Sequence, residues 1–267
     1  MVRRWLKNFL IVLLIITVSY QFYYVKILVK VINNNLVLLT DNIAEIIQNI
    51  DPKPDFDKMK LATVQIKIGK PDGIPKAGGA GVVIKGTEKY LYVLTVRHII
   101  NNKGQITIKF RKTNKIDDYI MIENVDRKNI YEDKIVDLAL IRVPKPEGNF
   151  HYIDLAKIPP KIGTKIYIIG HPFCFAYTIN EGIVTNYTER LSYSKKEWIF
   201  LQLNAPAING NSGGAVVNGN TELIGIMRGI MYIDKGYFFK DITLFPNYSF
   251  AIKLEDIKRF LKEVEKE

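Results

Sequence analysis

Three short strings in the sequence hold side chains that could together carry out nucleophilic catalysis. The string L-T-V-R-H ends at His98, and Asp137 opens the apolar run Leu138–Val143. Ser212 lies inside the glycine-rich string G-N-S-G-G. A serine hydroxyl is a poor nucleophile until an adjacent base accepts its proton, and that base needs an orienting carboxylate. Glycines beside the serine allow a tight turn that aims backbone N–H groups at a developing oxyanion.

Each string alone has an ordinary structural explanation, so their order along the chain matters. A histidine after a strand is often a packed or exposed residue, and a single aspartate is often a turn residue. G-x-S-x-G also fits the nucleophile elbow of α/β-hydrolases, in which the acid and the histidine follow the serine. No histidine follows Ser212, so that alternative fails. The order in this chain is His98, Asp137, Ser212.

Composition limits the other kinds of chemistry. The chain has 267 residues, of which 48% are hydrophobic and 24% charged, which suits one large domain or two small ones plus an appendage. One cysteine excludes an intramolecular disulfide framework, and three histidines without an H-E-x-x-H string leave little for a metal enzyme. We therefore expect no metal and no cofactor.

The net charge of +11 raises the question of nucleic-acid binding. The basic residues are dispersed, with no run of five or more, which is typical of a solvated surface. We expect no nucleic-acid partner. We expect the positive charge to favour binding to an anionic membrane surface instead.

The N-terminus has the pattern of a membrane anchor. Arg3, Arg4 and Lys7 precede the apolar run Phe9–Val25, which nearly crosses a hydrocarbon core of roughly 30 Å. We expect an uncleaved signal anchor over residues 1–27, with the rest of the chain extracytoplasmic because positive charge stays on the cytoplasmic side. The alternative is a cleaved signal peptide and a secreted protein, although no A-x-A-like cleavage site is evident.

Residues 28–50 continue with apolar residues in steps of three and four. Such a stripe predicts a coiled-coil stalk, in which the frequent isoleucines favour a trimer or tetramer over a dimer, or else an amphipathic helix lying on the domain or the bilayer. Among the oligomers we expect a homotrimer, formed through the stalk or through the domain. Two prolines, Pro52 and Pro54, end the helix. We expect a linker over residues 51–58.

The body of the chain, residues 59–253, has a strand-like pattern. Short apolar or alternating runs are separated by turn residues, and this spacing is typical of an all-β barrel or sandwich. Two such units are expected, at about 59–146 and 158–253, followed by a surface helix over residues 254–267. The clearest runs are Thr63–Ile68, Gly81–Ile84, Tyr90–Thr95, Gln105–Phe110, Leu138–Val143, Lys165–Ile169, Trp198–Leu203 and Leu223–Met227.

Taken together, the strings resemble the chymotrypsin-like (trypsin-like) serine peptidases, most closely their disulfide-free HtrA/Deg-type branch. The resemblance covers residues from about 60 to 253. It also rests on G-A-G-V-V-I ahead of L-T-V-R-H, on V-D-L-A-L-I, on G-H-P-F with E-G-I-V, and on L-I-G-I with F-A-I after the serine. Only about fifteen residues follow Ile252, so we expect a member without a PDZ domain.

The resemblance implies an all-β fold of two six-stranded antiparallel β-barrels, with the active site in the cleft between them. His98 would be the general base, Asp137 its orienting partner and Ser212 the nucleophile. The backbone N–H groups of Gly210 and Ser212 would form the oxyanion hole.

The same resemblance places the substrate pocket. Its base would be Pro206, and Met227, Arg228 and Gly229 would form the other wall, although Arg228 could equally be a solvated charge. With no acid in the pocket, we expect small or aliphatic residues before the cleaved bond. The partners would be protein or peptide substrates, for example in protein quality control; the alternative is a catalytically latent, peptide-binding or chaperone-like member of the fold.

Overall fold

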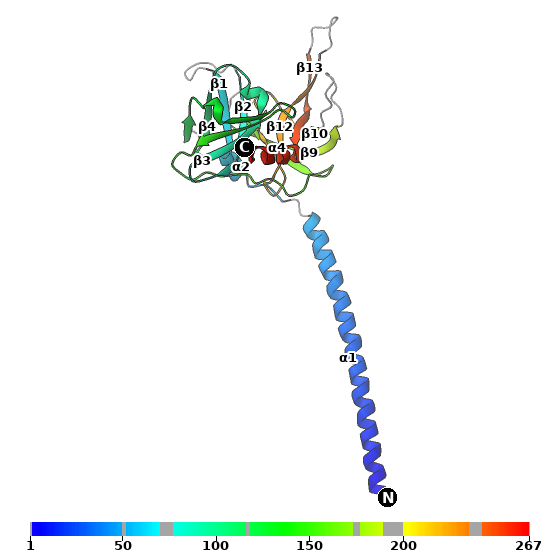
Figure 1. The fold of residues 1–267 in the computed structure, drawn as a ribbon. Coiled ribbons are helices and arrows are strands. Elements are labelled where there is room, and N and C mark those ends of the chain that lie inside the picture. The colour runs from blue at the N-terminus through cyan, green and yellow to red at the C-terminus, as the bar shows by residue number, and fades with distance from the viewer. Residues whose placement is uncertain are drawn as a thin grey trace. The chain divides into compact units, whose positions relative to one another are not determined.

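The computed structural model describes residues 2–49, 52–69, 77–115, 118–172, 177–188, 200–234 and 242–266. The chain divides into two compact units, residues 1–51 and 52–267, and each is described by itself. The second unit contains all of the strands that the structure describes (Figure 1).

The first unit is a single helix, α1 (Val2–Asn49). It joins the two segments that the sequence analysis treated separately, residues 1–27 and 28–50, without a break. The segment Trp5–Thr40 has a mean hydropathy of 1.8 and none of it is buried. By length and composition it could cross a membrane, as a signal sequence also could. The hydroxyl of Thr17 donates to the carbonyl of Leu13 at 2.7 Å, so this polar group is satisfied within the helix.

The first half of the second unit is a seven-stranded antiparallel sheet in the order β5-β4-β1-β2-β3-β7-β6. A strand-like pattern was expected over this region. The edge strands β5 and β6 are only four residues long, too short to show a clear period in the sequence. The strands are β1 (Thr63–Gly69), β2 (Ala77–Gly86), β3 (Tyr90–Val96), β4 (Gln105–Arg111), β5 (Tyr119–Ile122), β6 (Ile130–Asp133) and β7 (Leu138–Pro144), with a 3-10 turn η1 (Arg127–Asn129) before β6.

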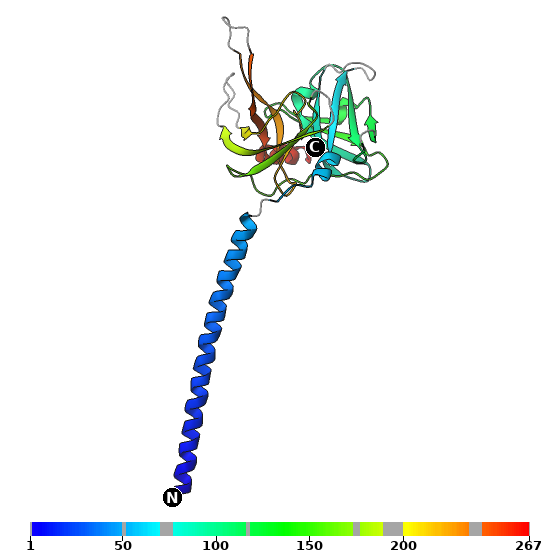
Figure 2. The ribbon, with the colours of Figure 1, turned by 180° about the vertical axis from the view of Figure 1, so that it is seen from behind.

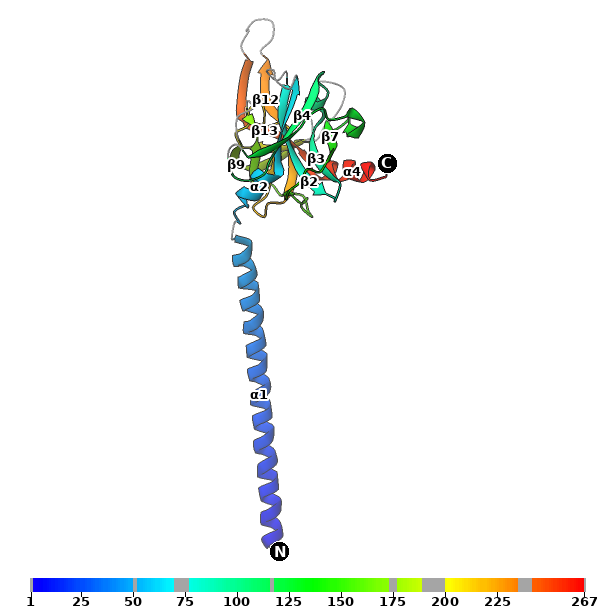
Figure 3. The same cartoon turned by 90° about the vertical axis from the view of Figure 1, so that its left-hand side faces the viewer.

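The second half is a closed six-stranded barrel in the order β10-β13-β12-β11-β8-β9, in which β9 also pairs with β10. Closure leaves no unpaired edge around the barrel. Figure 3 shows β12 and β13 side by side, and they pair from Gly225 opposite Lys253 to Asp234 opposite Ile242. The strands are β8 (Lys165–Gly170), β9 (Thr178–Thr188), β10 (Phe200–Asn204), β11 (Ala215–Val217), β12 (Leu223–Asp234) and β13 (Ile242–Lys253).

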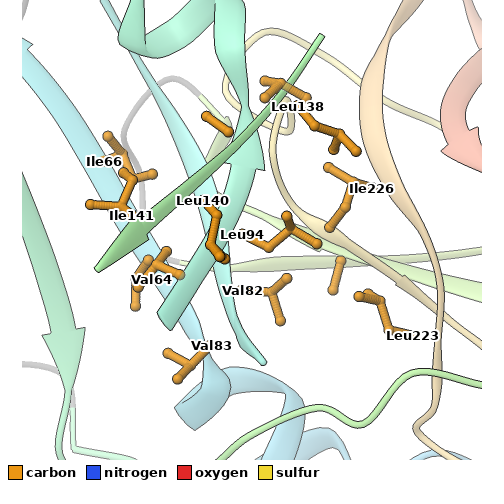
Figure 4. Close-up of a cluster of buried hydrophobic side chains, with 14 of the residues drawn as sticks. Val64, Ile66, Val82, Val83, Leu94, Leu138, Leu140, Ile141, Leu223 and Ile226 are labelled. Atoms are coloured by element: carbon orange, nitrogen blue, oxygen red, sulfur yellow. The ribbon is translucent and has the colours of Figure 1, made fainter. Parts of the chain in front are cut away.

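The described residues form two hydrophobic core clusters, one shared by both halves and one within the barrel half. Figures 1 and 2, seen from opposite sides, show the strands of the sheet gathered on one side of this unit and those of the barrel on the other. In Figure 4, Leu223 and Ile226 of β12 lie in the same cluster as Val82 and Leu94 of the sheet, and all four are fully buried. Burying each such side chain contributes about 1.5–3 kcal/mol, so the contact between the halves is part of the fold's stability. The expected all-β, chymotrypsin-like architecture is confirmed, but the first half is a seven-stranded sheet rather than the expected six-stranded barrel, because the short strands β5 and β6 extend it at its edges.

In the described part of this unit, three α-helices accompany the strands. The C-terminal helix α4 (Leu254–Val264) buries Leu254, Ile257 and Phe260 at the predicted helical spacing. A second helix, α2 (Phe56–Ala62), begins inside the segment expected to be a linker, because Asp55 caps it by accepting the N–H of Lys58 at 2.9 Å. The third, α3 (Arg97–Ile100), is a single turn that carries His98.

Candidate active site

The position of His98 follows from the pairing of β3 with β7. These antiparallel strands place Val96 directly opposite Leu138, so the residues just beyond their ends, His98 and Asp137, emerge at the same edge of the sheet. In α3, Ile99 and Ile100 are buried and anchor the turn, while the imidazole of His98 stays 45% exposed. The packing of α3 thus holds the backbone of His98 and leaves its ring in reach of solvent.

Asp137 contacts His98 twice. Its Oδ1 accepts the backbone N–H of His98 at 2.9 Å, and its Oδ2 lies 2.7 Å from His98 Nδ1. The aspartate side chain is only 8% exposed, and its backbone has φ +66°. Asp and Asn tolerate this left-handed region better than most side chains. The contact at Nδ1 assigns that nitrogen as a donor and leaves Nε2 of His98 as the acceptor.

Ser212 is held by a turn between β10 and β11. The N–H of Asn211 donates to the carbonyl of Ile208 at 3.1 Å, with Gly210 at φ +103° in the third position, as a type II turn requires. Ser212 is tied to the sheet because its carbonyl accepts the N–H of Ala80 at 2.8 Å. The nucleophile candidate therefore lies where the two halves meet.

The Ser212 hydroxyl donates to the backbone carbonyl of Arg228 at 3.2 Å. Within the described parts of the chain, the N–H groups of Gly210 and Ser212 donate to no other residue. Unengaged N–H groups flanking a serine are what an oxyanion hole needs.

A small pocket adjoins Ser212. Met227 is buried and Gly229 has open space where a side chain would begin. Pro206 is exposed and does not line this pocket; Ala207, its buried neighbour, does. The pocket is lined by Ala207, Ile208, Asn209, Asn211, Ser212, Met227 and Gly229.

The profile of the trypsin-like peptidase domain matches residues 79–226, which include all three candidate catalytic residues. The chain belongs to this family. The expected resemblance is thereby confirmed.

Individual relatives agree with this assignment of the peptidase domain. Over 159 residues it is 33% identical to the periplasmic serine endoprotease DegP of Salmonella typhimurium, which covers 59% of this chain and 31% of DegP. Over 221 residues it is 27% identical to a serine protease HtrA-like protein of Staphylococcus aureus, covering 77% of this chain and 26% of that protein. The chain thus matches less than a third of the length of these relatives.

The fold of the peptidase domain is also that of a solved structure. A serine endoprotease from Yersinia pestis superimposes with a TM-score of 0.58 at 23% sequence identity, over 79% of this chain and 65% of the other. At this level of sequence identity, the structural similarity shows only that the two proteins share a fold.

Arg228 has a contact in the peptidase domain that the sequence analysis missed. Its Nε lies 3.3 Å from Asp137 Oδ2 and the side chain is 35% exposed, so it is not a freely solvated charge. No feature of the linear pattern signals this, because the direction of the side chain depends on a β-bulge in β12.

Two other polar residues flank the site. Arg97, next to His98, pairs through Nε with Glu132 Oε2 at 3.0 Å. His171, the histidine of the G-H-P-F string, is buried; its backbone N–H donates to the carbonyl of Gly210 at 3.3 Å, and the centroid of its ring lies 4.6 Å from that of Tyr177. His171 thus supports the turn that carries the oxyanion-hole candidates.

Proposed function

We propose that this chain is a serine endopeptidase that hydrolyses peptide bonds of protein substrates through an acyl-enzyme formed on Ser212. The observation that carries the proposal is the double contact of Asp137 with His98. It fixes both the position and the tautomer of the imidazole, so that Nε2 is the acceptor.

The reaction follows from these positions. The Ser212 hydroxyl turns from the carbonyl of Arg228 toward His98 and attacks the substrate carbonyl carbon, while its proton passes to Nε2 of His98. The resulting oxyanion is stabilised by the N–H groups of Gly210 and Ser212. His98 then gives its proton to the leaving amine as the C–N bond breaks. A water molecule, activated by the same imidazole, hydrolyses the ester and restores the serine.

The pocket beside Ser212 supports a preference for small side chains before the cleaved bond. The described lining residues include no acid and no base, and they include the buried Met227. A basic side chain would find no partner there, and leaving its charge unpaired is costly.

Helix α1 supports a location at a membrane. We propose that it anchors the peptidase domain on the extracytoplasmic side, and that the stalk region brings copies together as a trimer. The apolar length of Trp5–Thr40 supports the anchor, and the basic residues ahead of it support the orientation. An enzyme tethered in this way would meet misfolded or regulatory proteins at the membrane surface.

Labelling with a fluorophosphonate probe tests the proposal, because the probe reacts only with an activated serine. The full chain should be labelled, and Ser212→Ala and His98→Ala should each abolish labelling. His151→Ala is the matched control, since His151 is exposed and shares none of the described hydrogen bonds or ion pairs with the triad, and its labelling should equal that of the natural sequence.

A second candidate is a latent, peptide-binding member of the fold, and one contact favours it. The Ser212 hydroxyl donates to Arg228 rather than to His98 in this structure. A folded protein that is not labelled at any pH would support this candidate and contradict the proposed peptidase.

A further inference from the structure

One carboxylate oxygen in the site serves two cationic or potentially cationic side chains. Asp137 Oδ2 lies 2.7 Å from His98 Nδ1 and 3.3 Å from Arg228 Nε. Since both nitrogens contact the same oxygen, they lie within about 6 Å of one another, a distance at which one charge alters the protonation of another group.

A β-bulge explains why Arg228 reaches Asp137. In the pairing of β12 with β13, Met227 lies opposite Ala251 and Gly229 lies opposite Phe250, so Arg228 is the extra residue. A bulge interrupts the strict alternation of side chains and turns the extra residue in a new direction. Without the bulge, the regular alternation of side chains along β12 would determine the face of the strand from which Arg228 projects.

Further contacts fix the Arg228 side chain and backbone. Its guanidinium carbon lies 5.3 Å from the centroid of the Phe200 ring, a cation–π distance. Its backbone carbonyl accepts the Ser212 hydroxyl. A single residue thus contacts the aspartate through its side chain and the serine through its backbone.

We propose that Arg228 is a positioning residue that shares the Asp137 carboxylate with His98 and so lowers the pH at which the peptidase becomes active. The inference deepens the proposed function and rests on its triad. A carboxylate favours the protonated imidazole beside it, whereas a guanidinium on the same oxygen offsets that effect. Neutral imidazole is the form that accepts the serine proton.

The charged groups on the neighbouring elements are engaged in ion pairs of their own. On α3 and β6, Arg97 pairs with Glu132 at 3.0 Å; Asp133 of β6 pairs with Arg259 of α4 at 3.3 Å. The titratable His171, after β8, packs its ring on Tyr177. Among the described ion pairs, those of Asp137 involve two side chains, His98 and Arg228.

The test measures how fast Ser212 of the full-length chain reacts with diisopropyl fluorophosphate from about pH 5 to about pH 9, a range that brackets imidazole titration. This small reagent reports the state of the serine and its base without a peptide in the subsites. Arg228→Met keeps the length of the side chain and removes its charge, and Arg228→Lys restores a charge. Arg259→Met is the matched control, because it removes an arginine that pairs with an aspartate away from the triad.

We expect Arg228→Met to move the midpoint of the rising limb upward by about half a unit to one unit, a shift typical of a partly exposed neighbouring charge. The rate at pH 6 would then fall about threefold to tenfold while the plateau changes little. Arg228→Lys should return most of the shift, and Arg259→Met should leave the midpoint in place. If Arg228→Met does not fold, Arg228→Gln takes its place.

Two results would overturn the inference. A midpoint unchanged within about 0.2 unit in a well-folded Arg228→Met or Arg228→Gln protein would show that the contact does not tune the base. A higher KM for peptides with an unchanged midpoint would make Arg228 a substrate contact instead. Failure of the natural sequence to react at all would overturn the proposed function along with the inference, and is thereby distinguished from both.

Discussion

Asp137 holds both the backbone and the side chain of His98, through its two carboxylate oxygens. Oδ1 accepts the backbone N–H at 2.9 Å and Oδ2 meets Nδ1 at 2.7 Å. The carboxylate therefore fixes where the histidine sits as well as which nitrogen carries the proton. These two roles are separable by mutation.

Asp137→Asn should remove the charge while keeping the shape. Asparagine tolerates the φ of +66° at this position, so we expect the protein to fold with little loss of stability. Its amide can donate to Nδ1 and so favour the wrong tautomer of His98, which in such triads lowers kcat about 10⁴-fold. Peptide hydrolysis and a urea unfolding curve measure the two effects. A variant with more than about a tenth of the original kcat/KM would contradict the role of Asp137 as the orienting group.

Gly213 should be the least replaceable residue of the serine turn. It has φ +81°, and a Cβ there would collide with the carbonyl oxygen of Ala80 and with Thr95 Oγ1. Gly213→Ala should therefore lower the free energy of unfolding by more than about 3 kcal/mol and abolish fluorophosphonate labelling.

Gly163 provides the matched control for that change. Its φ is +87°, but a Cβ would meet nothing within 4 Å. Gly163→Ala should lower the free energy of unfolding by only about 1–2 kcal/mol, the cost of backbone strain, and leave labelling intact. Equal losses of stability in the two variants, measured by chemical denaturation, would show that strain rather than collision dominates at Gly213.

Tyr177 should make the protein sensitive to alkaline pH. Burial raises the pKa of Tyr177 above the ordinary value of 10.0, although Arg111, whose Nε donates to its hydroxyl at 3.0 Å, opposes the shift. The phenol loses its proton more readily in the unfolded chain, so stability is retained below pH 10 and falls as the pH rises through the raised pKa.

Tyr177→Phe should flatten this loss of stability between about pH 9.5 and about pH 11. The exposed Tyr248 is the control, because its phenol meets water in both states, and Tyr248→Phe should leave the slope unchanged. Urea unfolding at several pH values gives the comparison. An identical slope in Tyr177→Phe would assign the alkaline sensitivity to other groups.

Removal of residues 2–49 should release the protein from membranes without unfolding the peptidase domain, which has its own core in residues 52–267. The full chain should resist extraction by alkaline carbonate, and the shortened chain should be soluble. Leu14→Arg, within the apolar segment of α1, should weaken insertion by about 3 kcal/mol, whereas Leu14→Ala should not. A mature protein whose measured mass lacks the N-terminal segment would instead show a cleaved signal.

The strand ends that carry the site could be predicted from the sequence. The apolar runs ahead of His98 and after Asp137 correspond to β3 and β7, and each predicted strand coincides with one in the structure except that Trp198 and Ile199 lie outside the described residues. The order of the three motifs along the chain was informative because it excluded the α/β-hydrolases. The pairing of β3 with β7, which brings the two residues together, depends on contacts between segments far apart in sequence.

Three features could not be predicted from the pattern. The direction of Arg228 depends on a one-residue bulge, and period-2 reasoning has no means of placing it. The pocket takes Ala207 rather than Pro206, a difference of one position that a resemblance by spacing does not resolve. Helix α2 is only seven residues long, and its cap, Asp55, follows prolines that indicate a linker equally well.

The hydrogen bond from Ala80 to the carbonyl of Ser212 has a consequence for how the protein is made. During translation, the sheet with His98 and Asp137 is synthesised first, and the turn that contains Ser212 follows only after the first strands of the barrel. A chain that is only half synthesised therefore contains the candidate base, His98, but not Ser212, the hydroxyl group that it would activate. Hydrolysis by this protein would have to wait until the second half has emerged and docked on the first.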